Sequence, residues 1–195
     1  MDDLEARQLP VRCSAFDTRF VALHWLLAAL IVGAFFTGLY MVGLVFSPLR
    51  FRLFNWHKWV GMGVLALSLA RLGWRLGLTR KRPLPAGMPA WQLAASRGTH
   101  LAFYALFLIV PLLGWLYTSA VGVPVVWFGW LALPDLTPLN KPFGDQVLKP
   151  LHSASAYLLA GLVALHAAAA LKHQLVDRDG LLSDMWPWWP SRSRP

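Results

Sequence analysis

Charged residues and cysteine are scarce in this sequence. Charged side chains make up 14% of its 195 residues and hydrophobic ones 57%, whereas soluble domains carry about 25% charged and about 45–50% apolar residues. The mean hydropathy is +0.50. This balance excludes a soluble enzyme and a disordered chain. The single cysteine, Cys13, excludes an internal disulfide.

Four apolar stretches are long enough to cross the roughly 30 Å of hydrocarbon in a bilayer, which takes about 20 helical residues. They predict membrane spans at about residues 20–46, 54–76, 99–121 and 150–171. The sequence therefore predicts an all-α fold, an integral membrane four-helix bundle that forms a single membrane domain over residues 1–195. A further apolar run, 123–133, is too short to span, and Trp127 and Trp130 predict that it lies at the membrane interface.

The positive charges are distributed unevenly between the two ends of the predicted spans. Thirteen of the 18 lysines and arginines lie in the N-terminal segment, around the loop between the second and third spans, or in the C-terminal tail. Because basic residues concentrate on the cytoplasmic side, both termini are predicted to be cytoplasmic. In a membrane protein the position of charges matters more than their sum, so the net charge of +9 does not indicate a nucleic-acid partner.

Six histidines occur, and each lies in or at the edge of a predicted span: His24, His57, His100, His152, His166 and His173. Ionisable residues at membrane depth are costly and are therefore functional candidates. His57 and His152 both lie close to the outer ends of their spans. His166 lies on the same helix face as His152 but roughly 21 Å deeper, at the depth of His24. The depths therefore predict an outer pair, His57 with His152, and an inner pair, His24 with His166.

Facing imidazoles in the core of a helix bundle can bind haem iron from both sides. A zinc site needs three or four convergent ligands, usually with cysteine or carboxylate, and a proton relay needs carboxylates within the membrane. The predicted spans contain no Asp or Glu, and Cys13 lies outside them. The spacing therefore favours two haems. The alternative left open is that the histidines are structural residues hydrogen-bonded to the backbone.

Other residues near these pairs carry weaker signals. Gly61, Gly63 and Gly161 would leave room for a flat macrocycle, although glycine is also common where membrane helices pack. His173 is predicted to lie near haem propionates or quinone, or alternatively at a solvated helix end. His100 lies near the cytoplasmic boundary and is assigned no role.

Four segments between residues 18 and 187 read RFVALHWLLA, FNWHKWVGMGVLALSLARLGWRL, HLAFYALFLIVPLLGWLYTS and, most specifically, LHSASAYLLAGLVALHAAAALKHQLVDRDGLLSDMWP. With them the sequence resembles the bacterial cytochrome b561 family of four-helix inner-membrane proteins. The resemblance implies a multi-pass protein of the bacterial inner membrane with two haem b groups, ligated by His24 and His166 inside and by His57 and His152 outside. It also implies electron transfer from periplasmic superoxide, or another one-electron donor, to ubiquinone.

The predicted outer loops carry a positive balance that bears on the electron donor. Five basic residues face two acidic ones there, a net charge of +3: Arg50, Arg52, Lys58, Lys141 and Lys149 against Asp135 and Asp145. A positive rim would steer a small anion toward the outer haem. The alternative is that these are ordinary snorkelling side chains at a membrane surface.

Two other functions remain open. Relatives with the same fold and haems serve as the cytochrome b subunit of a larger complex, which passes electrons between a hydrogenase or dehydrogenase and quinone. A haem-free binding or scaffold protein is the third reading, and it would show no haem absorption. The expected partners are quinone and membrane lipid, and the sequence is compatible with a homodimer or with a larger redox complex.

Overall fold

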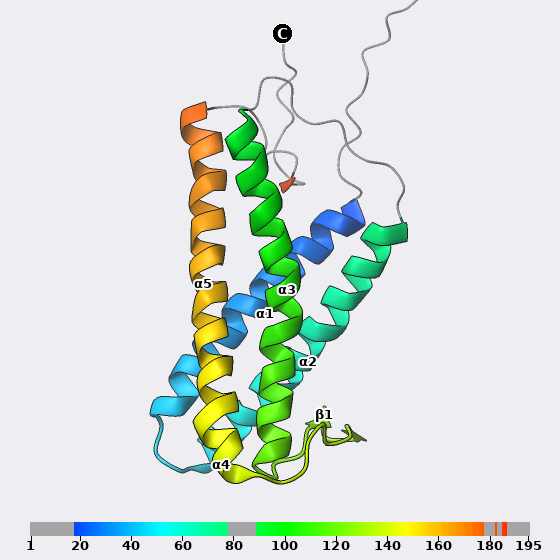
Figure 1. The fold of residues 1–195 in the computed structure, drawn as a ribbon, viewed down its shortest axis with the longest axis vertical. Helices are drawn as coiled ribbons and strands as arrows, with labels where there is room; N and C mark the ends of the chain where they lie inside the picture. Colours follow the sequence, from blue (N-terminus) through cyan, green and yellow to red (C-terminus); the bar gives the residue numbers. More distant parts are fainter. Residues whose placement is uncertain (1–17, 78–88, 178–181, 183–184, 187–195) are drawn as a thin grey trace, which may run out of the picture.

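Four long helices form a bundle in the computed structural model, which describes residues 18–77, 89–177, 182 and 185–186 (Figure 1). They are α1 (Thr18–Gly43), α2 (Pro48–Gly77), α3 (Ala90–Ala120) and α5 (Lys149–Lys172). The start of α1, the end of α2, the start of α3 and the end of α5 all lie at one end of the bundle. Cys13 and the Arg-rich part of the second loop lie outside the described residues.

Helices α2, α3 and α5 are longer than the apolar stretches that predicted them, whereas α1 ends at Gly43, before the predicted end at residue 46. α2 begins at Pro48, six residues before the predicted span, because Ser47 caps it: the Ser47 hydroxyl accepts a hydrogen bond from the backbone N–H of Arg50 at 3.3 Å. Proline suits the first turn of a helix, where no N–H partner is needed. α3 likewise begins at Ala90, nine residues before the predicted span. Polar helical turns thus extend beyond the apolar segments.

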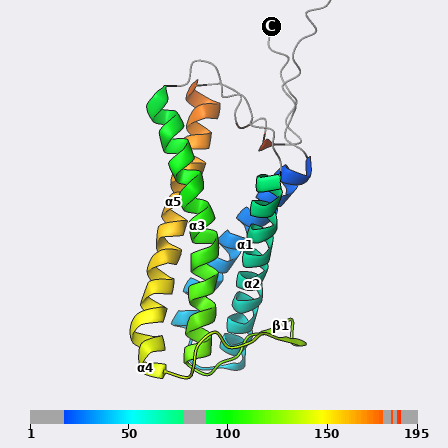
Figure 2. The same cartoon turned by 45° about the vertical axis from the view of Figure 1, so that its right-hand side comes forward.

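Neighbouring helices pack in the order α1, α2, α3, α5, whereas α1 and α5 scarcely touch (Figure 2). The buried core is apolar and includes residues from all four helices: Leu27, Ile31, Val64, Phe103, Leu106 and Leu159. Many other large apolar side chains are exposed, as expected for a surface in contact with lipid. The bundle is therefore sealed on three sides and open between α1 and α5.

Three helical segments of the described chain are long and apolar enough to cross a membrane: Thr18–Gly43, Ala90–Ala120 and Lys141–Asp177. α2 lies between two of them but carries basic residues near both of its ends, at Arg50, Arg52 and Arg71. The prediction that α2 also spans the membrane therefore depends on its packing between α1 and α3.

A short β-hairpin, absent from the all-α prediction, occupies the apolar run 123–133. Strands β1 (Val126–Trp127) and β2 (Leu131–Ala132) pair antiparallel. Indole groups attach the hairpin to α2: Trp59 Nε1–H donates to the Val126 carbonyl at 2.6 Å, and Trp127 Nε1–H donates to the Trp59 carbonyl at 3.1 Å. These reciprocal bonds hold the hairpin against the helix that carries His57.

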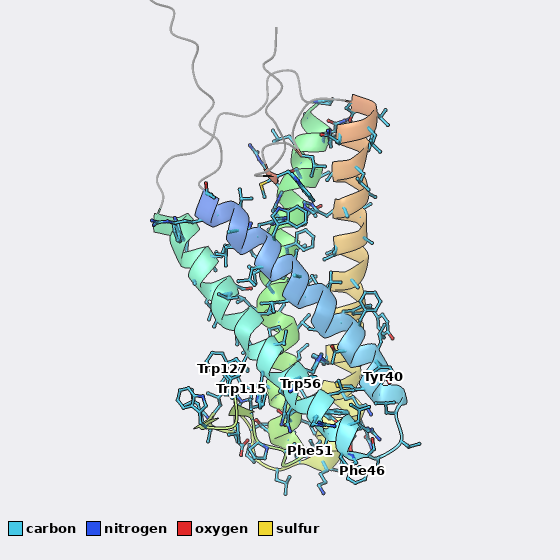
Figure 3. The ribbon with its side chains drawn as sticks, turned by 180° about the vertical axis from the view of Figure 1, so that it is seen from behind. Tyr40, Phe46, Phe51, Trp56, Trp115 and Trp127 are labelled. Carbon is cyan, nitrogen blue, oxygen red and sulfur yellow. The ribbon has the colours of Figure 1, made fainter. Side chains whose placement is uncertain are left out.

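Aromatic side chains gather at the end of the bundle where the hairpin lies. Among them are Tyr40, Phe46, Phe51, Trp56, Trp115 and Trp127 (Figure 3). Aromatic residues, tryptophan and tyrosine above all, favour the boundary between hydrocarbon and water. Their position agrees with the predicted interfacial place of Trp127.

The chain enters α5 through a tight helical corner. α4 (Lys141–Phe143) runs into a π-helical turn, η1 (Gly144–Leu148), and then into α5. A Cβ at Gly144 would lie 2.8 Å from Val121 Cγ1, so only glycine allows η1 to pack this closely against the end of α3. At its other end α5 continues into a second π-helical turn, η2 (His173–Asp177).

Candidate functional site: two histidine pairs

The outer pair of histidines lies between α2 and α5, at the end of the bundle that carries the hairpin. The ring centroids of His57 and His152 are 6.1 Å apart, and the ring planes meet at 87°. A metal–imidazole bond measures about 2 Å and the ring centre lies roughly 1 Å beyond the nitrogen, so two imidazoles on opposite sides of one metal have centroids about 6 Å apart. The observed separation matches axial ligation of one iron.

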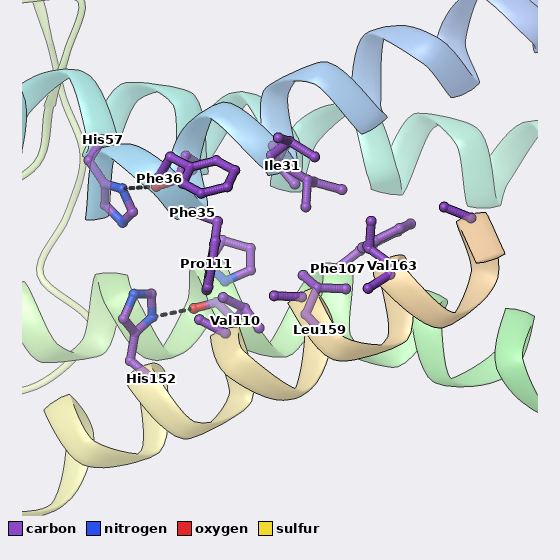
Figure 4. Close-up of a pocket in the computed structure, with 18 residues that line it drawn as sticks. Ile31, Phe35, Phe36, His57, Phe107, Val110, Pro111, His152, Leu159 and Val163 are labelled. Carbon is purple, nitrogen blue, oxygen red and sulfur yellow. Dashed lines mark hydrogen bonds between the residues drawn. The ribbon is translucent and has the colours of Figure 1, made fainter. Parts of the chain in front are cut away.

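Both outer rings are fixed by a backbone carbonyl of a neighbouring helix. His57 Nδ1 lies 3.0 Å from the carbonyl oxygen of Ala34 on α1, and His152 Nδ1 lies 2.9 Å from that of Val110 on α3 (Figure 4). When Nδ1–H donates to a carbonyl, the lone pair of Nε2 is left available. This is the usual arrangement of a metal-binding histidine.

A glycine follows each of these carbonyls by one helical turn and lies against the same ring. A Cβ at Gly38 would lie 3.2 Å from His57 Cε1, and a Cβ at Gly114 would lie 3.1 Å from His152 Cε1. Each outer histidine therefore occupies a seat made of one carbonyl and one glycine. The seats on α1 and α3 are built in the same way.

An apolar cavity of about 300 Å³ extends from the outer pair along the open side of the bundle. His57 and His152 lie at one end of its wall, and Leu159 and Val163 of α5 lie further in (Figure 4). Apolar walls with a few convergent polar groups are typical of a small-molecule or cofactor site. The cavity and the facing imidazoles together fit a flat, largely apolar macrocycle.

The inner pair lies at the other end of the bundle, between α1 and α5. The ring centroids of His24 and His166 are 6.4 Å apart, and their planes meet at 64°. This separation also matches two axial ligands of one metal. The structure thus brings together both pairs that the sequence predicted from depth, and their role as ligands stays a prediction.

A third imidazole, His100, reaches the inner pair from α3. Its ring centroid is 5.8 Å from that of His166, and the ring of Phe103 lies 5.4 Å from His166. Because α3 packs directly on α5 while α1 and α5 stand apart, a macrocycle has more room between His24 and His166 than between His100 and His166. The sequence assigned no role to His100 because depth alone does not say which helices pack together.

The surroundings of the inner pair include the C-terminal segment. Trp25, next to His24, donates an indole hydrogen bond to the carbonyl of Met185 at 2.7 Å and packs edge-on against Trp186, with ring centroids 5.2 Å apart. On α2, the guanidinium of Arg71 lies over the ring of Phe20, 4.6 Å from its centroid. Aromatic and basic groups therefore surround the inner site.

His173 lies beyond the end of α5, in η2, and contacts Asp177 of the same turn. Its Nδ1 is 3.1 Å from Asp177 Oδ2, and Lys172 Nζ is 2.6 Å from the same oxygen. These contacts are compatible with the solvated-end reading of His173. A place near quinone or propionates stays a prediction.

The five basic residues assigned to the outer loops all lie in helices: Arg50, Arg52 and Lys58 in α2, Lys141 in α4 and Lys149 at the start of α5. Arg50 and Arg52 are helical because α2 begins earlier than its apolar stretch, and Lys58 lies within that stretch. Lys58 Nζ donates to the carbonyl of Pro124 at 3.1 Å, next to the hairpin. They remain at the end of the bundle that the sequence predicts to be the outer one.

The glycines singled out from the sequence are not the ones that contact histidine. A Cβ at Gly61, Gly63 or Gly161 would meet no atom within 4 Å, and of the three only Gly61 lines the cavity. Gly38 and Gly114 escaped notice because their partners lie on other helices. The only trace in the sequence is a glycine at the matching depth of each neighbouring span.

The number of metal-binding side chains at each site distinguishes haem from a metal ion that is held by protein side chains alone. Within the described part of the chain, no three His, Cys, Asp or Glu side chains are grouped so that they could hold a metal ion. Zinc needs three or four such ligands, whereas haem brings its own equatorial nitrogens and needs only two axial imidazoles. The residues present therefore fit haem.

A helical membrane bundle with facing imidazoles at two depths has the architecture of a membrane b-type cytochrome. The chain belongs to the prokaryotic cytochrome b561 family, whose sequence model it matches over residues 15–188. It is therefore a multi-pass protein of the bacterial inner membrane, and the family implies b-type haem and a role in electron transfer.

Individual relatives agree with this assignment. The chain is 33% identical to cytochrome b561 homolog 2 of Escherichia coli over 165 residues, 84% of this chain and 87% of the relative. It is 28% identical to the probable superoxide oxidase CybB of Yersinia pestis over 171 residues, 86% of this chain and 93% of that protein. A shorter match of 99 residues, also at 33%, links it to cytochrome b561 homolog 1 of Escherichia coli.

Proposed function

We propose that this protein is a di-haem cytochrome that transfers electrons from periplasmic superoxide to ubiquinone. The observation that carries the proposal is the pair of facing imidazole sites at two depths, with centroids 6.1 and 6.4 Å apart. Similarity to a probable superoxide oxidase supports superoxide as the donor.

Each pair has a defined part in this proposal. His57 and His152 would hold the outer iron, and His24 and His166 would hold the inner iron. When bound, haem b supplies a one-electron couple. The carbonyls of Ala34 and Val110 fix the outer imidazoles in the ligating tautomer and raise their donor strength.

The position of the two pairs suits transfer across the membrane. His152 and His166 are separated by roughly 21 Å along α5, and the apolar cavity extends inward from the outer pair. Loss of one electron converts superoxide to dioxygen, and two electrons with two protons convert ubiquinone to ubiquinol. Two superoxide anions are therefore consumed for each ubiquinol formed.

Positive charge at the outer end suits an anionic donor. Basic residues in α2 and around the entry to α5 lie at that end, namely Arg50, Arg52, Lys58, Lys141 and Lys149. A field of one sign raises the local concentration of a small anion and its rate of encounter. If two histidines hold the outer iron, the donor would not need to bind the metal itself.

The test is stopped-flow spectroscopy on purified, detergent-solubilised protein mixed with an enzymatic source of superoxide and a soluble ubiquinone analogue. The proposal expects haem reduction and ubiquinol formation that superoxide dismutase abolishes. Haem that superoxide does not reduce, in a protein that co-purifies with a hydrogenase or dehydrogenase subunit, would instead establish the role of a cytochrome b subunit.

A further inference from the structure

Three polar side chains from three elements lie at the outer end of the bundle, beyond the outer histidine pair. They are Arg50 on α2, Tyr117 on α3 and Asp145 in η1, here called the outer polar cluster. The Tyr117 hydroxyl donates to Asp145 Oδ1 at 3.4 Å. The proposed function counts Arg50 among the basic residues that attract the donor, but gives Tyr117 and Asp145 no role and gives Arg50 none toward haem.

Arg50 lies on the helix face that carries the outer histidine of α2. It precedes His57 by seven residues, which brings the two within about 20° of the same helix face, and it lies roughly 10 Å further out. Its guanidinium carbon is 5.5 Å from the centroid of the Phe54 ring. Phe54 comes between the two along α2, and Arg50 is half-buried rather than fully exposed.

Tyr117 lies on α3, the helix whose Val110 carbonyl fixes the other outer histidine, His152. It follows Val110 by seven residues on α3, and the carbonyl of Val110 is the one bonded to His152 Nδ1. Asp145 reaches Tyr117 because Gly144 lets η1 pack tightly against the end of α3. The outer polar cluster is therefore held in place by the same helices that hold the outer pair.

A haem is apolar except along one edge, which carries two propionate carboxylates. A guanidinium binds a carboxylate with two parallel hydrogen bonds, and a phenol can donate one more. We propose that Arg50 binds a propionate of the outer haem, that the Tyr117 hydroxyl contributes a hydrogen bond, and that Asp145 positions Tyr117. This inference rests on the proposed function, since it requires haem between His57 and His152.

The binding has an electrostatic consequence. Local charge and hydrogen bonding are among the protein's means of setting a haem potential. A cation beside the propionate offsets its negative charge, and that negative charge favours the oxidised iron. Arg50 therefore raises the reduction potential of the outer haem and leaves the distant inner haem unchanged.

The experiment is a spectroscopic redox titration of the purified holoprotein and its Arg50→Gln variant. The expected result is two haems per chain in both proteins and a lower outer potential in the variant. The ratio of oxidised to reduced outer haem should change by about tenfold at fixed ambient potential, about 59 mV for a one-electron couple. Tyr117→Phe should lower the same potential by less.

Arg52→Gln is the matched control. It removes the same charge from the same turn of α2, but Arg52 is exposed and is directed about 200° around the helix from Arg50. The reduction potential of the outer haem in Arg52→Gln should equal that in the wild type. If Arg50→Gln fails to retain the outer haem, Arg50→Lys, which keeps the charge, should retain it.

The inference would be overturned by an unchanged reduction potential of the outer haem in Arg50→Gln, by an equal shift in Arg52→Gln, or by loss of the outer haem in Arg50→Lys. Slower reduction by superoxide without any change in potential would likewise overturn it, since Arg50 would then act on the donor. Fewer than two haems in the wild type would contradict the proposed function itself.

Discussion

Gly38 and Gly114 each lie against the ring of a histidine that belongs to another helix. A histidine ring can ligate a metal only if it is held in one orientation, and here the carbonyl fixes Nδ1 while the glycine leaves room for the ring. At the scale of single residues, the outer site therefore depends on the seat as much as on the ligands.

Replacement of Gly114 by alanine tests the seat. Its Cβ would lie 3.1 Å from Cε1 and 3.2 Å from Nδ1 of His152, so the ring must shift away from Val110. We expect a shifted or lost outer-haem absorption band, measured in reduced-minus-oxidised spectra, with the inner haem retained. Gly33→Ala is the control, because a Cβ at Gly33 would meet nothing within 4 Å. An unaltered spectrum in Gly114→Ala would show that the seat is dispensable.

The ring planes of the two pairs predict different magnetic properties. Those of His57 and His152 meet at 87° and those of His24 and His166 at 64°. Perpendicular axial imidazoles leave two iron d orbitals nearly equal in energy, so the outer ferric haem should give the more anisotropic low-spin EPR signal. Assignment follows from the signal lost in His152→Ala. A single signal shared by both haems would contradict the ring orientations.

At the scale of elements, the hairpin of β1 and β2 is held on α2 by indole hydrogen bonds. Trp59→Phe removes the 2.6 Å bond to Val126, at a cost of about 1 kcal/mol. We expect faster proteolysis within residues 123–133 while both haems remain bound. The control is Trp56→Phe, since Trp56 lies on the exposed side of the same helix. The protease should cleave this variant at the wild-type rate. Equal cleavage in all three proteins would show that other contacts hold the hairpin.

The sequence predicts the helices better than their ends. Apolar length indicates each long helix, but polar turns such as those after Ser47 and Ala90 extend beyond the apolar part. The hairpin was missed because strands of two residues leave no alternation to detect. The histidine pairs were found because helix rise converts residue number into depth. The contacts of His100, Gly38 and Gly114 were not, because they depend on which helices are neighbours.

At the scale of the whole molecule, the predicted outer end carries a net positive charge. Basic residues at the outer end should steer superoxide, and such steering is screened within roughly 8–10 Å at physiological salt. The rate of superoxide-driven haem reduction should therefore fall as ionic strength rises, while dithionite-reduced spectra stay the same. A salt-independent rate would remove electrostatic steering from the account.

The bundle is open between α1 and α5, and bound haem would account for this gap. Other neighbouring helices pack closely, whereas these two scarcely touch although each contributes a histidine to the inner pair. A macrocycle between His24 and His166 would fill this side and join the two helices. Bound haem is thus expected to stabilise the bundle as well as to carry electrons.

The most direct test of the central claim is the number of haems per chain in purified wild type and in the His152→Ala and His24→Ala variants. The account predicts two b-type haems in the wild type, loss of the outer haem alone in His152→Ala and loss of the inner haem alone in His24→Ala. Two haems retained in either variant, or fewer than two in the wild type, would contradict the assignment of the two histidine pairs.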